Sequence, residues 1–85
     1  RTRRQRTLET RRDEWSVLRP QLTQFDSSIE SESILRLMER AFEEEDVYVV
    51  DEISAAVKAS ISQGTPEAIR DVQEVLELEF NAGGR

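Results

Sequence analysis

The 85-residue chain contains no cysteine and no histidine. Without cysteine it has no disulfide framework, no thiolate zinc site and no cysteine nucleophile. Without histidine it lacks the commonest general base and the commonest metal-binding side chain. We therefore predict a protein that is not an enzyme, with no catalytic residues, no bound metal and no cofactor.

Long apolar runs and glycine-rich loops are also missing. No apolar run exceeds a few residues, so neither a signal peptide nor a membrane span is indicated. Gly83 and Gly84 stand at the end of the chain and form no phosphate-binding loop. We expect a cytoplasmic or nuclear protein with no membrane contact and no small-molecule substrate. Because the chain begins with Arg1 rather than Met, we expect it to be part of a longer protein.

The charge is unevenly distributed along the chain. Residues 1–12 contain six arginines and one glutamate, a net charge of +5, whereas the remaining residues have a net charge of −11. This contrast predicts a basic, flexible or helical arm over residues 1–12, an acidic helical domain over residues 13–82 and a flexible tail over residues 83–85. The acidic domain disfavours nucleic-acid binding everywhere except the arm.

Helical spacing of apolar residues begins near Thr7 and continues to Phe25. Pro20 interrupts this segment, which predicts a kink or two short helices. Ser27 and Glu30 are spaced as in a capping box and predict the start of a second helix. The acidic run at residues 43–46 predicts its end, because negative charge disfavours a helix C-terminus.

The third predicted helix starts near Asp46, a favourable N-cap residue, and stops at Gly64. In the fourth, Thr65 is expected to be the N-cap and Pro66 the first helical residue, with an end near residues 81–84. Short connections between four such segments predict an all-α fold, a small antiparallel bundle of three to four helices. One apolar stripe per helix predicts the core: Trp15, Leu18, Leu22, Phe25, Ile34, Leu37, Met38, Phe42, Val50, Ile53, Val57, Ile61, Ile69, Val72, Leu76 and Phe80.

Some helices are apolar beyond that single stripe, and two interpretations remain open. The extra residues either fill a larger internal core or form an exposed surface for a partner or a second copy. Because the chain has no reactive group, we expect a non-catalytic protein–protein interaction or oligomerisation module that binds a protein partner or self-associates as a homo-oligomer. The predicted partner-binding residues are Leu35, Val47, Tyr48, Ala68, Val75 and Leu78.

The arginine-rich start supports an alternative function. Guanidinium groups bind phosphates in a bidentate manner, so the arm is expected to contact nucleic acid or another anion while the helical body dimerises. The residues of this alternative are Arg1, Arg3, Arg4, Arg6, Arg11 and Arg12. The same residues could also form a solvated tail or linker, or dock on an acidic protein surface, including that of a neighbouring copy of this domain.

Overall fold

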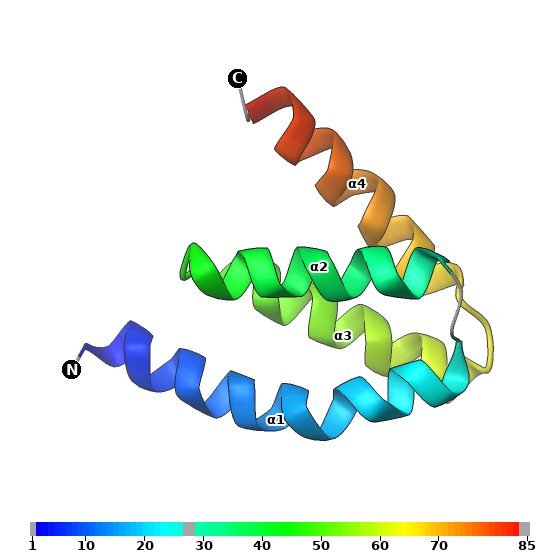
Figure 1. Ribbon diagram of the computed structural model, residues 1–85, viewed down its shortest axis with the longest axis horizontal. Helices are drawn as coiled ribbons and strands as arrows, with labels where there is room; N and C mark the ends of the chain where they lie inside the picture. Colours follow the sequence, from blue (N-terminus) through cyan, green and yellow to red (C-terminus); the bar gives the residue numbers. More distant parts are fainter. Residues whose placement is uncertain (1, 27–28, 84–85) are drawn as a thin grey trace.

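The computed structural model describes residues 2–26 and 29–83, and the side chains of residues 2–26 and 31–79. It contains four helices: α1 (Arg3–Phe25), α2 (Ile29–Glu43), α3 (Val47–Gln63) and α4 (Glu67–Gly83). The helices pack against one another and the described residues include no strand, which confirms the all-α bundle. Successive helices reverse direction, and α4 leans away from α2 towards its C-terminal end (Figure 1).

Helices α1 and α4 occupy opposite edges of the bundle. Each packs against α3 and also contacts α2, but in the part of the chain that the structure describes α1 and α4 do not contact each other. In Figure 1 the two edges face opposite directions, and the first turns of α1 extend beyond the α2–α3 connection. The outer faces of α1 and α4 therefore remain available to other molecules at the same time.

Helix α1 is one continuous helix, so the expectation of two short helices is wrong. Pro20 lies within it on the exposed side, and Figure 1 shows α1 as gently curved rather than broken. A proline inside a helix costs about 3 kcal/mol. Burial of Leu18 and Leu22 on either side of it contributes about 1.5–3 kcal/mol each, so packing outweighs the missing backbone hydrogen bond.

The connection between α2 and α3 falls within residues 43–46, as predicted. Glu45 has a left-handed backbone with φ of 56°. Its N–H donates to the carbonyl of Phe42 at 3.1 Å, and the N–H of Asp46 donates to that of Ala41 at 2.9 Å. This pair of bonds is a Schellman motif. Asp46 then caps α3, because its carboxylate accepts the N–H of Val49 at 3.2 Å.

The start of α4 differs from the prediction. Gly64 ends α3 in a left-handed conformation, as expected. However, Thr65 does not cap α4: the hydroxyl of Ser60, in the last turn of α3, accepts the N–H of Ile69 at 3.1 Å. Pro66 precedes the helix, and its carbonyl accepts the N–H of Arg70 at 3.0 Å. The predicted capping box at Ser27 lies outside the described residues.

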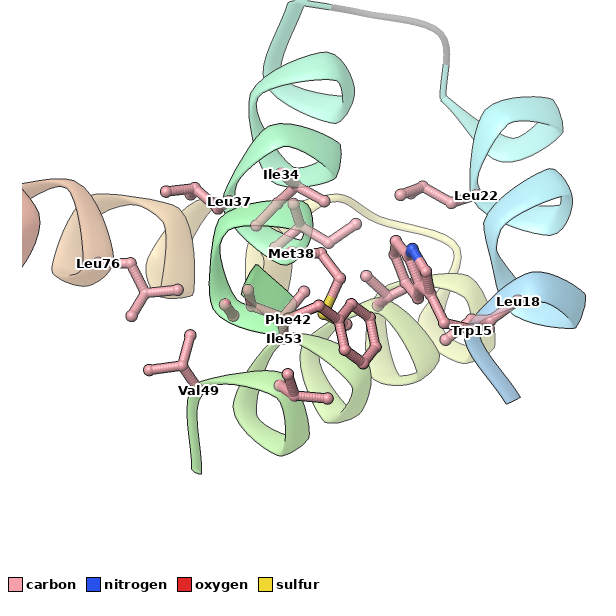
Figure 2. Close-up of a cluster of buried hydrophobic side chains, with 14 of the residues drawn as sticks. Trp15, Leu18, Leu22, Ile34, Leu37, Met38, Phe42, Val49, Ile53 and Leu76 are labelled. Carbon is pink, nitrogen blue, oxygen red and sulfur yellow. The ribbon is translucent and has the colours of Figure 1, made fainter. Parts of the chain in front are cut away.

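The core lies where the four helices meet, and Figure 2 shows its central side chains. Most predicted core residues are buried, whereas Phe25, Ile61 and Val72 are partly buried and the side chain of Phe80 lies outside the described part. Among the described residues, the prediction missed four further buried apolar residues: Leu8, Ala41, Val49 and Ala56. None of the described helices is long and apolar enough to cross a membrane.

Candidate interaction surfaces

The outer face of α4 exposes two large apolar side chains. Leu78 is 70% exposed and Val75 is 50% exposed, whereas Leu76 between them is fully buried. A helix places residues three positions apart on the same side, so Val75 and Leu78 are neighbours on the surface. Both were predicted as partner-binding residues, and the structure brings these two together.

Carboxylates surround this apolar pair. Among residues 67–79, α4 has five exposed acidic residues and one exposed basic residue, Arg70. Glu67, Asp71, Glu74 and Leu78 follow at spacings of four, three and four, and all are exposed. They therefore form one stripe along the outer side of the helix. We call this stripe, together with Val75, the α4 face.

Helix α4 extends beyond the bundle after Leu76. Glu77, Leu78 and Glu79 are all exposed, although consecutive helical residues point in directions about 100° apart. Figure 1 shows the corresponding part of α4 diverging from α2. One polar contact to α2 persists in this part of the helix, where the hydroxyl of Ser33 donates to the Glu77 carboxylate at 3.1 Å. Residues 77–79 are thus exposed, while Glu77 keeps one hydrogen bond to α2.

The other predicted apolar site residues are more dispersed. Tyr48, in the first turn of α3, is 73% exposed. Its neighbour Val49 points towards Leu76 of α4 in the core (Figure 2). Leu35 and Val47 are half-buried and pack against the core, and Ala68 is also half-buried. These three residues support the fold as well as contributing to the surface.

Residues 3–12 form the first part of α1 and are anchored by Leu8, which is buried. A capping box starts the helix: the Thr2 hydroxyl accepts the N–H of Gln5 at 3.1 Å, and the Gln5 side chain accepts the N–H of Thr2 at 2.9 Å. The pattern Thr-x-x-Gln was visible in the sequence and could have indicated this start. Arg1 lies outside the described residues.

Two of the six predicted anion-contacting arginines bind the domain itself. The Arg11 guanidinium donates to the Asp51 carboxylate of α3 at 2.6 Å and lies 3.9 Å from the Glu14 carboxylate. The hydrogen bond and charge of Asp51 hold the pKa of Arg11 above its ordinary value, so Arg11 stays protonated. Arg12 lies over the ring of Phe42, with 4.4 Å to its centroid. These contacts hold both guanidinium groups against the body of the domain.

The other described arginines of residues 3–12 differ from Arg11 and Arg12 in their contacts. Arg3, Arg4 and Arg6 are exposed, and none forms an ion pair within the described part of the chain. They lie near the N-terminus of α1, whose first turn contains no acidic residue. Positive side chains at this end are unfavourable to the helix macrodipole. The segment therefore presents uncompensated positive charge at one edge of the molecule.

Val17 is an exposed apolar residue that the sequence analysis did not single out. It is 63% exposed on α1 and borders a shallow hollow lined also by Glu14, Leu18, Gln21 and Lys58. The sequence indicates this exposure, because Val17 lies outside the helical spacing that joins Trp15, Leu18 and Leu22. An apolar residue outside the core stripe of an amphipathic helix is expected on the surface.

The acidic side chains of the described residues do not form a metal-binding group, since no three of them are arranged to hold an ion. Comparison with protein-family models, with curated proteins and with solved structures found no match to this chain. The described residues offer a partner two charged edges with exposed apolar side chains.

Proposed function

We propose that this domain is a non-catalytic interaction module that self-associates through the α4 face. The observation that carries this proposal is the exposure of Leu78 and Val75 on the outer face of α4. Burial of a large aliphatic side chain contributes about 1.5–3 kcal/mol, so leaving two of them in water forgoes stabilisation that a partner can supply.

A second copy of the chain is favoured as the partner because the molecule provides charges of both signs. The α4 face is acidic, and its exposed carboxylates repel one another when no cation is near. The same chain presents Arg3, Arg4 and Arg6 without ion-pair partners at the opposite edge. Complementary charges of this kind increase association rates and select the partner.

The proposal is tested by measuring the weight-average mass by light scattering at about 50 mM salt, over protein concentrations from about 5 to about 500 µM. The wild-type mass should rise with concentration. Leu78→Glu should weaken association at least about tenfold, because it places a charge where apolar contact is expected. A wild-type chain that remains monomeric throughout contradicts the proposal.

The matched control is Gln63→Glu, which introduces the same charge at an exposed position of the last turn of α3. It should associate like the wild type. Circular dichroism should show that both variants stay helical, since Leu78 is exposed and contributes little to the core. If Leu78→Glu unfolds the domain, Leu78 belongs to the core and the proposed surface is wrong.

Nucleic-acid binding is the alternative function, supported by the exposure of Arg3, Arg4 and Arg6. Two observations weigh against it: Arg11 and Arg12 already contact the domain, and Trp15 is buried and therefore unable to stack on bases. A titration with duplex and single-stranded DNA and RNA at about 50 mM salt decides the matter, because phosphate contacts are strongest at low salt. Absence of binding there excludes this alternative.

A further inference from the structure

The outer side of α1 carries a stripe of its own. Its members follow at spacings of three, four, three and four and are all exposed: Arg3, Arg6, Thr10, Asp13 and Val17. Such spacing places them on one side of the helix. We call this stripe the α1 face. It begins with two unpaired arginines and ends with an exposed apolar residue.

The α1 face and the α4 face match in spacing, and the charges at their first residues are complementary. Arg6 precedes Val17 by eleven residues, and Glu67 precedes Leu78 by eleven residues. At 1.5 Å per residue, each charged group lies about 16 Å along its helix from the apolar one. Two helices aligned in parallel would therefore place Arg6 opposite Glu67 and Val17 opposite Leu78 at the same time.

The two faces cannot meet within one molecule. They lie on helices at opposite edges of the bundle, and α1 and α4 make no contact in the described residues. We propose that the α4 face of one copy binds the α1 face of a second copy, so that the chain assembles head to tail. This inference rests on the proposed self-association and specifies its second surface.

The surroundings of Val17 suit an incoming leucine. The hollow beside Val17 has Leu18 in its wall, and the Lys58 side chain of α3 borders it. Leu78 of a second copy would bury its side chain against Val17, in a hollow whose lining carries charges of both signs, Glu14 and Lys58. A contact of this kind uses different surfaces on its two sides, so one molecule can engage two others.

Two variants separate this arrangement from other modes of association. The first carries Arg3→Glu and Arg6→Glu and loses the basic part of the α1 face. Acidic residues near a helix N-terminus are favoured by the macrodipole, so this variant should keep α1 intact. The second is Leu78→Glu, which blocks the α4 face. Each variant retains the face that the other lacks.

Sedimentation velocity at about 50 mM salt provides the readout. The wild type should form species larger than dimers as its concentration rises, whereas each variant alone should remain monomeric. An equimolar mixture of the two should form a 1:1 dimer and grow no further, because only one productive contact is left. Association of the mixture should disappear when either partner carries both sets of substitutions.

Three results would overturn the inference. If the Arg3→Glu, Arg6→Glu variant associates like the wild type, the α1 face is not the second surface, although the α4 face can still mediate association. If the mixture gives no dimer, head-to-tail pairing is excluded. If the wild type is monomeric but binds DNA or RNA through these arginines, both this inference and the proposed self-association fail.

Discussion

The hydroxyl of Ser60, near the end of α3, accepts the backbone N–H of Ile69, in the first turn of α4, at 3.1 Å. Ser60 is fully buried, and the bond joins two helices across the tight Gly64 turn. A helix start leaves its first N–H groups without intrahelical partners, and one of them is satisfied here by the preceding helix. This contact fixes how α4 leaves α3 and therefore the direction of the α4 face.

Ser60→Ala should lower the free energy of unfolding by about 1–2 kcal/mol, because it leaves a buried N–H without a partner. Thr65→Ala, at the position first expected to cap α4, should change it by less than about 0.5 kcal/mol, since Thr65 is exposed. Urea denaturation measures both values. If both variants lose the same free energy of unfolding, Thr65 caps α4 as well as Ser60.

Glu45 is the one described residue other than glycine with a positive φ. A side chain in this conformation costs about 1–2 kcal/mol, partly offset by the greater freedom of glycine in the unfolded chain. Glu45→Gly should therefore raise the free energy of unfolding by about 0.5–1 kcal/mol in urea denaturation.

Glu45→Ala is the control, because it removes the charge but keeps the Cβ atom. Its stability should stay well below that of Glu45→Gly. Replacing glycine at the other left-handed position gives a second comparison. Gly64→Ala should lower the free energy of unfolding by about 1 kcal/mol, because φ at Gly64 is 77°. Steric contact is not the reason, since nothing lies within 4 Å of the added Cβ atom. Equal stabilisation by glycine and alanine at position 45 would show that charge, not backbone strain, matters at this turn.

The sequence predicted the four helices and most of the core because apolar spacing records which side of each helix is buried. It could not predict the cap of α4, since Ser60 reaches Ile69 only after α3 and α4 have packed. The division between residues 1–12 and the helical domain rested on charge alone. The structure instead joins Leu8, Arg11 and Arg12 to the body through burial, an ion pair and a ring contact.

For the candidate surface, sequence spacing identified Val75 and Leu78 as residues outside the core stripe. The spacing could not show whether Val75 and Leu78 face solvent or another part of the chain, because their exposure depends on where α4 leaves the bundle. Leu35 and Val47 had the same kind of spacing but pack against the core, since neighbouring helices cover their side of the chain. Whether such a residue is exposed or packs against the core is therefore decided by tertiary packing, not by periodicity.

Asp13 tests the parallel alignment of the two faces. When Arg6 lies opposite Glu67 and Val17 opposite Leu78, Asp13 lies opposite Glu74, and the two carboxylates repel each other. Asp13→Lys replaces this repulsion with attraction and should tighten association about three- to tenfold at about 50 mM salt. Sedimentation equilibrium at low and high salt measures the change.

The gain should disappear at about 500 mM salt, where charges on the surface are screened. Glu39→Lys is the matched control, because it makes the same charge change at an exposed position of α2 that belongs to neither face. If Glu39→Lys tightens association to the same extent, the effect of Asp13→Lys is due to net charge and not to its position. Weaker association of Asp13→Lys would contradict the parallel alignment.

Amide hydrogen exchange measured as a function of protein concentration tests the central claim most directly, because it locates any new protection along the chain. If the α4 face binds the α1 face of a second copy, protection of residues 75–79 and of residues 3–8 should rise together with concentration in the wild type. Neither segment should gain protection in Leu78→Glu. Exchange rates that are the same at every concentration, or protection that rises only elsewhere in the bundle, would contradict the account.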